Sequence, residues 1–468
     1  MPHPTLPSQP ETAGKSGRGV FGAVFLVLAG TFLAWAIPLW IIGYMRGRGA
    51  FDQHYFHIKV VRRFLAQWPA PDLSNYESAT APGYHLVLAA IAKIVGRDPL
   101  VLQIIASLFT LAMLGVVACL IARAATAARA TALECCALVL PIACSMYVLF
   151  PGVWLQPDNA AWLGVFAILA LALPARRGFG WLIGGALILM ALVFVRQNQI
   201  WSAALLWAAA WLNAAPVPDG NISTLLSRPM RRISGTMVAV WVSLPAFGVV
   251  AWLFRLWGGP VPPDFQNQHA SGANLATPAF TLALIALYSV FLFAWLAPSL
   301  GRLWRESRPP IGLAAIAGAA LAAIPETTFL HEPRSSGLWN LVRLEERLGL
   351  SIAHHTSPGM VALSTLGAVA LLGWLAALRP RERWVLAAAL VAFTAAQTAN
   401  SNCWQRYFEP FLLVVVVLMA LLGRPVTDSP RYGPLFAPGR VLGPAALALA
   451  LAAVTLHGLL TGEVLRWE

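Results

Sequence analysis

The stretch VFGAVFLVLAGTFLAWAIPLWIIG, residues 20–43, decides the fold class. It carries no charged side chain, and it exceeds the roughly 20 apolar residues that an α-helix needs to cross a membrane. It is also too long for the core of a signal peptide, and no small-residue cleavage site follows it. Residues 20–43 are therefore predicted to form a retained membrane helix, preceded by a polar cytoplasmic tail at 1–19.

The rest of the chain repeats this apolar pattern. Of its 468 residues, 59% are hydrophobic and 11% are charged, whereas soluble domains average about 25% charged residues. No internal repeat or low-complexity linker divides the sequence, which predicts one all-α, polytopic membrane domain, 20–468, with about thirteen transmembrane helices. The predicted spans are 20–43, 99–122, 130–149, 157–174, 179–195, 199–214, 233–256, 276–299, 310–325, 357–378, 383–399, 407–423 and 441–460.

The distribution of charge predicts the orientation. The net charge of +13 could suggest a nucleic-acid partner, but the basic residues come in twos and threes between apolar runs and form no stripe or tail. With the N-terminus inside, the cytoplasmic segments hold 18 of the 32 Lys and Arg residues and 6 of the 19 acids. This asymmetry indicates the topology of a membrane protein and argues against nucleic-acid binding. In a bacterium, the membrane would be the inner membrane.

The same orientation places the long loops 44–98, 257–275 and 326–356 on the outer side, and long loops are usually functional. The predicted active site therefore lies on the outer face. The five cysteines show neither CxxC nor metal-ligand spacing, and the histidines lack carboxylates at ligand spacing. No metal or other cofactor is expected. The chain also lacks the Walker A, GxGxxG, GxSxG and HExxH motifs, which argues against nucleotide hydrolysis.

The first outer loop starts with Phe51-Asp52-Gln53-His54-Tyr55-Phe56-His57. From there to Trp68 the apolar residues follow helical spacing and the basic residues occupy the opposite face, which predicts an interfacial amphipathic helix. This helix could simply anchor the loop. Alternatively, Asp52 at its start could act as a general base, because partial desolvation raises the basicity of a carboxylate. An N-cap role for Asp52 is compatible with both interpretations.

Polar residues interrupt the apolar sequence at several other places on the predicted outer face. Tyr84 and His85 open a short apolar helix, 84–95, which is predicted to be re-entrant or interfacial. Asp158 is either an N-cap or a second site carboxylate. Arg196, followed by Gln197 and Asn198, could bind an anionic ligand in a cavity, or could be a turn residue that meets lipid phosphates. The other candidates are Asp264, His269, Arg334, Arg406 and Tyr407.

In this order, these segments resemble the polyprenyl-phosphate-dependent glycosyltransferases of the GT-C superfamily. They are most similar to the eukaryotic dolichyl-phosphate-glucose α-1,2-glucosyltransferases. Asp52 to His57 resembles that family's Asp-Glu-x-Phe-His, and its Arg-Gln-Thr-Asn-Ile-x-Trp resembles Arg196-Gln197-Asn198-Gln199-Ile200-Trp201, where the tryptophan follows the isoleucine directly. The remaining matches are Thr80 to Tyr84, Gln156 to Asp158, Trp257 onward to Asp264 and Asn267, and Arg406-Tyr407.

The first motif can be aligned in two ways. If Phe56-His57-Ile58 is matched to the family's Phe-His-Ile, Asp52 falls one residue away from the family's acid and Gln53 takes its place. The glutamate that follows the family's aspartate is also absent here. The alignment therefore leaves open whether Asp52 or a neighbour occupies the position of the base.

The resemblance implies an inverting, metal-independent hexosyltransferase that takes its sugar, glucose by analogy, from a polyprenyl-phosphate donor. Asp52 would deprotonate the acceptor hydroxyl, and arginines would stabilise the leaving phosphate. The acceptor would be a lipid-linked glycan, and membrane lipids would surround the protein. The implied phosphate-binding residues are Arg196, Arg406 and Arg334. The implied sugar- or acceptor-binding residues are His54, His57, Tyr84, His85, Asp158, Gln197, Asn198, Asp264, His269 and Tyr407.

Two other classes of function fit parts of the pattern. A transporter or flippase for a lipid-linked or anionic solute would need charged residues on broken helices at the midplane and a pseudo-repeat. Here the polar clusters lie at one face, and no repeat is visible. Other GT-C activities, such as protein mannosylation or aminosugar transfer to lipid A, differ in acceptor choice, which depends on the shape of the loops.

Overall fold

The computed structural model describes residues 12–176, 178–218, 221–267, 269, 272–330, 334, 337–427 and 433–461. All regular elements in these ranges are helices, which confirms the predicted all-α fold. Residues 1–11 of the predicted polar tail lie outside the described ranges, and from Thr12 onward the tail already belongs to the first helix. The N-terminal elements are α1 (Thr12–Ile41), α2 (Gly47–Asp52), the π-helix η1 (Gln53–His57), α3 (Ile58–Ala66), α4 (Gly83–Val95) and α5 (Pro99–Ala128).

The remaining elements form the bulk of the bundle. The middle of the chain contains α6 (Ala132–Cys144), α7 (Met146–Val153), α8 (Asp158–Ala172), α9 (Gly180–Val195), the 3₁₀ turn η2 (Gln197–Ser202), α10 (Ala203–Ala214), α11 (Ile222–Leu225), α12 (Pro229–Trp257) and η3 (Pro263–Phe265). The C-terminal part contains α13 (Thr277–Phe291), α14 (Phe293–Glu306), α15 (Pro309–Ala323), α16 (Trp339–Arg347), α17 (Pro358–Ala377), α18 (Pro380–Thr398), η4 (Gln405–Tyr407), α19 (Glu409–Thr427) and α20 (Gly433–Thr461).

Five helices in the described part of the chain, α1, α5, α12, α17 and α20, are long and apolar enough to cross a membrane. The pairs α6/α7 and α13/α14 pass the same test only together, and they bend by 61° and 105°. The predicted count of thirteen is therefore not confirmed. Several predicted spans fold as helices of only 15 or 16 residues, such as α8, α9 and α15, and hydropathy alone does not reveal where a helix breaks.

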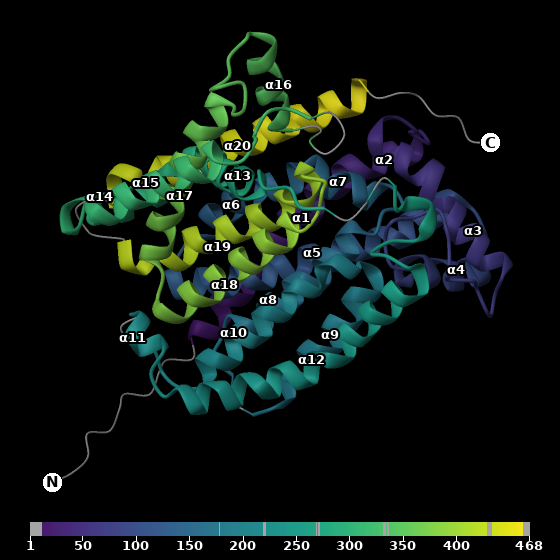
Figure 1. Cartoon of the computed structure of the whole chain (residues 1–468), viewed down its shortest axis with the longest axis horizontal. Coiled ribbons are helices and arrows are strands. Elements are labelled where there is room, and N and C mark those ends of the chain that lie inside the picture. Colours follow the sequence, from purple (N-terminus) through teal and green to yellow (C-terminus); the bar gives the residue numbers. More distant parts are fainter. Residues whose placement is uncertain are drawn as a thin grey trace.

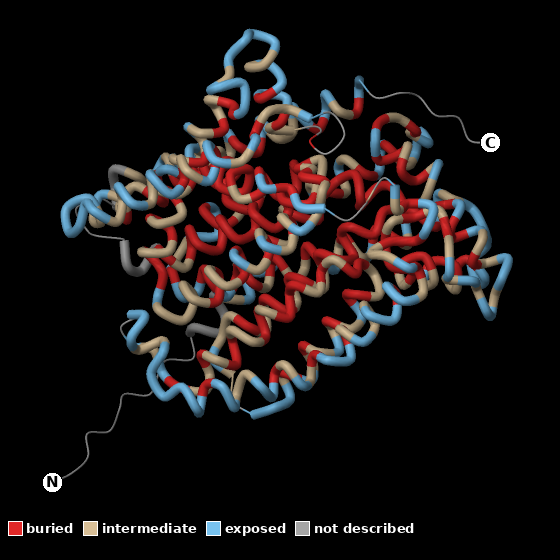
Figure 2. Tube along the Cα trace, viewed as in Figure 1, coloured by how far each residue is buried: buried red, intermediate tan, exposed pale blue. Residues whose placement is uncertain are grey.

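The helices that follow α1 gather at one end of the bundle, where α2, α3 and α4 lie together, whereas α11 and α14 lie at the other end (Figure 1). Buried residues fill the middle of the bundle, and exposed residues follow its periphery (Figure 2). Since the exposed surface of the long helices includes large apolar side chains such as Trp241 and Leu449, lipid is the solvent that this surface fits.

The predicted amphipathic helix of the first outer loop is present as η1 and α3. Val60, Val61 and Phe64 are buried, whereas Lys59 and Arg62 are exposed. The predicted short helix 84–95 is α4, and it packs against α3 and α9. A Cβ atom at Gly83 would lie 2.6 Å from the carbonyl oxygen of Phe194, so only glycine allows α4 to approach the end of α9 this closely.

Arginines at the end of the bundle away from α2 satisfy the last carbonyl groups of several helices. Arg381 donates to the carbonyl oxygens of Ala172, Leu173 and Pro174 at 2.8–2.9 Å and to Asn213 Oδ1 at 2.9 Å, which closes the end of α8. The C-terminal carbonyl groups of a helix have no partner within that helix and carry partial negative charge. Part of the basic charge predicted to mark the cytoplasmic face thus also stabilises helix ends.

We therefore expect Arg381→Ala to lower the free energy of unfolding by about 2–3 kcal/mol, because charge-assisted hydrogen bonds to buried carbonyl groups are lost. Thermal unfolding of the detergent-solubilised protein measures the effect. Arg379→Ala is the matched control, since Arg379 is exposed two residues earlier in the same segment. Equal unfolding temperatures for the two variants would contradict the stabilising role of Arg381.

Candidate active site

A cavity of about 340 Å³ opens at the end of the bundle where α2 and η1 lie. This volume is within the range of small-ligand pockets. Segments that are far apart in the sequence meet around it, and most of the polar motifs of the sequence analysis contribute side chains. Its polar lining includes Arg48, Asp52, His57, Asp158, Arg196, Gln197, Asn198, His269, Asn400, Trp404, Arg406 and Tyr407.

An aromatic cluster fixes several of these segments to one another. Trp201 of η2, Phe393 of α18 and Phe411 of α19 are mutual neighbours, with ring centroids 4.5–5.4 Å apart. Trp162 of α8 stacks on Phe411 at 6.2 Å. Such aromatic pairs contribute packing energy beyond the area that they bury. The cluster therefore holds the segments that carry Asp158, Arg196 and Arg406 on one rigid base.

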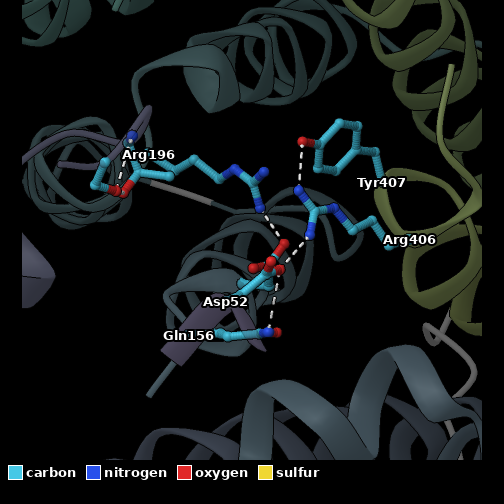
Figure 3. A network of polar contacts seen from close by, with 8 residues as sticks. Asp52, Gln156, Arg196, Arg406 and Tyr407 are labelled. Atoms are coloured by element: carbon cyan, nitrogen blue, oxygen red, sulfur yellow. Dashed lines mark hydrogen bonds and ion pairs between the residues drawn. The ribbon is translucent and has the colours of Figure 1, made fainter. Parts of the chain in front are cut away.

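Asp52 is the last residue of α2, and only 7% of its side chain is exposed. Its two carboxylate oxygens have different partners. Arg48 Nε lies 3.2 Å from Oδ1, and Arg406 Nη1 donates to Oδ2 at 2.8 Å. Gln156 Nε2 is 3.4 Å from Oδ2, and Figure 3 shows Asp52 between Gln156 and Arg406. The carboxylate is thus held at the cavity wall by residues from three separate segments.

Gln53, the alternative to Asp52, points elsewhere. Its side chain is fully buried, and its Oε1 accepts hydrogen bonds from Gln103 Nε2 and the Leu155 backbone N–H, both at 2.9 Å. It is not part of the cavity lining. The π-helical turn η1 begins at this residue, and its wider hydrogen-bond spacing adds one residue relative to an α-helical turn. Asp52 is therefore the carboxylate that this segment presents to the cavity.

Asp158 and Arg196 form a second ion pair in the lining. Asp158 is the first residue of α8, and Arg196 follows the last residue of α9, where the apolar sequence is interrupted as predicted. Arg196 Nη1 donates to Asp158 Oδ1, and both side chains are about nine-tenths buried. The guanidinium group of Arg196 also lies over the Tyr407 ring, 4.7 Å from its centroid. The structure therefore places Arg196 at a cavity, as one of the two interpretations of this residue requires.

Arg406 joins the two halves of the lining. Its Nη1 donates to Asp52, and its Nη2 donates to the Tyr407 hydroxyl at 3.1 Å (Figure 3). Its guanidinium group lies 4.7 Å from the Trp404 ring centroid and 5.0 Å from that of Tyr407. Since Arg196 lies over the same tyrosine ring, two guanidinium groups flank Tyr407. Together with Arg48, three guanidinium groups face the two carboxylates of the lining, so one positive charge is in excess and the site favours an additional anion.

Two histidines in the lining are neutral at physiological pH. Burial lowers the pKa of His57 to about 4 and that of His269 to about 4. His57 Nδ1 lies 2.9 Å from Nε2 of His85, and His269 Nδ1 lies 3.2 Å from Asn402 Nδ2. A neutral imidazole can both donate and accept hydrogen bonds. The pair is therefore suited to neutral hydroxyl groups and contributes no charge to the cavity.

Gln197 and Asn198 both line the cavity but differ in their partners. Gln197 accepts from the Ala81 backbone N–H at 2.8 Å and donates to the carbonyl groups of Ala79 and Pro260 at 3.0 Å, so it ties two loops together. Asn198 Oδ1 is buried and accepts no hydrogen bond from the residues that the structure describes. Of these two predicted sugar ligands, Asn198 has the free acceptor atom.

Other predicted site residues do not reach the cavity lining. His54 lies with its ring against Tyr55, and Tyr84 is buried beside Phe109. His85 contacts the site only through His57, and Asp264 is exposed on η3. Of these residues, His54 is close to Asp52 in sequence, the 78–85 turn is predicted to bring Tyr84 and His85 near it, and Asp264 belongs to an outer loop. Helical geometry turns neighbouring side chains to different sides, so proximity in sequence does not place them at one cavity.

Arg334 is also placed outside the cavity, where it has a different partner set. It is buried in the segment before α16, and it donates to the backbone carbonyl groups of Thr328 and Glu326. Its guanidinium group lies 5.1 Å from the Trp339 ring centroid. Arg334 therefore stabilises the chain at Glu326 and Thr328, away from the cavity, and its contact with a donor phosphate stays a prediction.

Sequence reasoning overlooked Arg48, Gln156 and Trp404 as site residues. Arg48 precedes Asp52 by four residues, which places the two side chains on the same face of a helix. That spacing was available as a signal. Gln156 contacts Asp52, which is 104 residues earlier in the sequence. This contact depends on how the helices pack, which no local sequence pattern reports. Trp404 contacts Arg406, which is two residues later in the same segment.

No family model and no curated protein matches the sequence. Two solved structures align along most of the chain. The structure of ArnT from Cupriavidus metallidurans in the apo state is 17% identical, with 92% of this chain and 75% of that chain covered and a TM-score of 0.39. The structure of ArnT bound to undecaprenyl phosphate is 15% identical, with 91% and 88% covered and a TM-score of 0.33. These identities and TM-scores are too low to support a conclusion about this chain.

Proposed function

We propose that the protein is an inverting glycosyltransferase that moves a sugar from a polyprenyl-phosphate donor to a hydroxyl acceptor. The ordered motifs from Asp52 to Arg406 resemble those of the GT-C superfamily, and the cavity gathers most of them. The observation that carries the proposal is the lining itself. It combines a held carboxylate, three guanidinium groups and two neutral imidazoles at one end of a membrane-embedded bundle.

The charges of the lining fit this donor class. The guanidinium groups of Arg48, Arg196 and Arg406 face the carboxylates of Asp52 and Asp158, which leaves one positive charge in excess. A polyprenyl-phosphate sugar is a phosphodiester and carries one negative charge. Transfer releases the phosphate as a monoester with a second negative charge, while the acceptor proton moves to Asp52. The cavity is thus neutral with the donor and again neutral with the products.

In this reaction the acceptor oxygen forms a bond to the anomeric carbon, and the bond from that carbon to the phosphate oxygen breaks. Asp52 takes the hydroxyl proton, and a single base suffices for one displacement with inversion. Arg406 and Arg196 hold the leaving phosphate, since a guanidinium group offers two parallel N–H donors to phosphate oxygens. His57, His269 and Asn198 bind hydroxyl groups of the sugar or the acceptor.

The one-residue offset in the first motif agrees with this assignment. In the family pattern the acid lies one residue nearer to the Phe-His pair than Asp52 does here. The π-helical turn between Asp52 and Ile58 adds one residue to that interval. The insertion keeps both Asp52 and His57 on the cavity wall, so the offset is compatible with Asp52 as the base.

The finer assignments follow the same resemblance. The sugar is a hexose, glucose by analogy with the dolichyl-phosphate-glucose enzymes, and the acceptor is a lipid-linked glycan. The reaction takes place on the outer face of the membrane, because the charge distribution favours a cytoplasmic N-terminus. No metal is required, because three guanidinium groups supply the positive charge that the leaving phosphate needs.

The decisive test incubates the purified protein in detergent with a panel of polyprenyl-phosphate sugars and lipid-linked glycans. Mass spectrometry should show one donor consumed and one acceptor heavier by a single sugar residue. The proposal would be overturned in favour of a flippase if no donor were consumed and the protein moved a labelled lipid across the bilayer of liposomes.

Arg48 provides a sharper test of the charge argument. We expect Arg48→Gln to weaken product binding more than donor binding, because the product phosphate carries the second negative charge. The affinity for geranyl phosphate, a short prenyl monophosphate, should fall about tenfold, which corresponds to about 1.4 kcal/mol. Isothermal titration calorimetry of the purified variant measures it. Arg62→Gln, an exposed arginine on α3, is the control, and equal affinities in both variants would contradict the role of Arg48.

A further inference from the structure

A buried acid that does not line the cavity binds residues next to those that do. Glu409 is the first residue of α19 and is 1% exposed. Its carboxylate accepts hydrogen bonds from the hydroxyl groups of Ser145 and Tyr288, the latter at 3.2 Å, and from Gln405 Nε2 at 2.6 Å. Burying a carboxylate costs folding free energy unless its oxygens accept hydrogen bonds. Three donors from three different segments satisfy this one.

Two of these donors lead directly to the cavity. Gln405 is the residue before Arg406, and η4 carries Gln405, Arg406 and Tyr407 on a single turn. Ser145 lies at the bend between α6 and α7, and its hydroxyl accepts from the Tyr147 backbone N–H at 3.1 Å. α7 then leads within a few residues to Gln156 and Asp158. Glu409 thus connects the segment of Arg406 to the segment of Asp158.

The segment that leads into α16 also holds η4. Gln405 Oε1 accepts from the Leu338 backbone N–H at 2.6 Å, and Trp339 Nε1 donates to the Cys403 carbonyl oxygen at 2.7 Å. Gly337 has φ of +59°, and a Cβ atom there would lie 1.9 Å from Gln405 Oε1. This segment therefore packs tightly on the Oε1 atom of Gln405, while Glu409 accepts from the Nε2 atom of the same side chain.

We propose that Glu409 is the positioning residue of this site. It fixes the Gln405 side chain, and through it the η4 turn, so that Arg406 reaches Asp52 and Tyr407 lies under Arg196. The inference rests on the proposed function, because Arg406 and Tyr407 matter through their contacts with the donor phosphate. Glu409 itself touches neither substrate, and its effect is expected on the geometry of the phosphate-binding arginines.

Two substitutions separate positioning from mere stability. Glu409→Gln keeps the shape and two acceptor lone pairs for Gln405 and Tyr288, and its new amide N–H groups can face Ser145, whose hydroxyl can also accept. Glu409→Ala removes all three hydrogen bonds. The control is Ser364→Ala, which removes a buried hydrogen bond from α17 to the Gly318 carbonyl oxygen, a contact between α17 and α15.

Steady-state sugar transfer is measured for the three variants, together with calorimetric binding of geranyl phosphate. We expect Glu409→Ala to lower kcat about 100-fold, because a displacement of a catalytic group by about 1 Å has this effect. Its affinity for geranyl phosphate should fall about tenfold. Glu409→Gln should retain most of both properties, and Ser364→Ala should keep wild-type kcat and affinity even if its melting temperature falls.

Hydrogen exchange followed by mass spectrometry reports the position of η4 independently of chemistry. Faster exchange in 403–408 for Glu409→Ala, and not for Glu409→Gln, supports positioning. Wild-type exchange, kcat and affinity in Glu409→Ala would overturn it, as would equal impairment of the alanine and glutamine variants. If the wild-type protein transfers no sugar, the proposed function fails, while hydrogen exchange still decides whether Glu409 fixes η4.

Discussion

Asp52→Asn is expected to abolish sugar transfer and to leave the protein folded. Loss of a general base typically lowers the rate about 10²–10⁴-fold. An asparagine can still accept a hydrogen bond from Arg406, so the packing of α2 against η4 is retained, but it cannot take the acceptor proton. The measurement is the steady-state rate of sugar transfer in detergent, with circular dichroism and size-exclusion chromatography as checks on folding.

The same variant should bind geranyl phosphate more tightly than the wild-type protein. Asp52 pairs with Arg406 and Arg48, so its carboxylate competes with phosphate for these two guanidinium groups. Removing that negative charge leaves both arginines available to the ligand. A merely structural role for Asp52 predicts the reverse, which is weaker binding together with lower activity.

The matched control is Asp264→Asn. Asp264 is a second acid of the predicted outer loops, but it is exposed and outside the cavity. We expect it to retain wild-type transfer and binding. If Asp52→Asn were as active as Asp264→Asn, another group would have to be the base, and the assignment of Asp52 would be wrong.

The helical segments of the fold could largely be predicted from the sequence, because apolar runs are long and uninterrupted. The run 99–122 lies within α5, and 233–256 lies within α12. The breaks could not be predicted in the same way. The sequence 276–299 has no charged residue, but it forms two helices that meet at 105° near Leu292. Such a bend depends on the neighbouring helices, and hydropathy contains no information about them.

Within the site, the clearest sequence signal is a polar residue that has no other reason to interrupt apolar sequence. Arg196 breaks the run from 179 to 214, and the structure places it in the cavity. Arg334 lies in a polar loop, where an arginine can equally well satisfy backbone carbonyl groups, and it does so. Glu409 was overlooked because a single acid at a helix start resembles an ordinary first-turn residue. Its three partners come from segments up to 264 residues away.

Arg406→Gln is expected to have an effect comparable to that of Asp52→Asn but through the donor phosphate. Removal of one preorganised donor to a developing negative charge typically lowers kcat about 10²–10³-fold. Arg406 also contacts both Asp52 and Tyr407 through different guanidinium nitrogens, so a fork of two N–H groups is required. Arg406→Lys should therefore restore only part of the activity, because an ammonium group is a point charge without that fork.

Arg334→Gln is the control for Arg406→Gln, because it removes a buried arginine that lies outside the cavity. It should lower the melting temperature while leaving the affinity for geranyl phosphate unchanged. The double variant Asp52→Asn with Arg406→Gln distinguishes independent from joint action. If the two groups act as one unit, the double variant should transfer sugar no more slowly than the worse single variant. If instead the fold-losses in transfer rate of the two single variants multiplied in the double variant, Arg406 and Asp52 would contribute independently. The ion pair between them would then place both groups without coupling their chemistry.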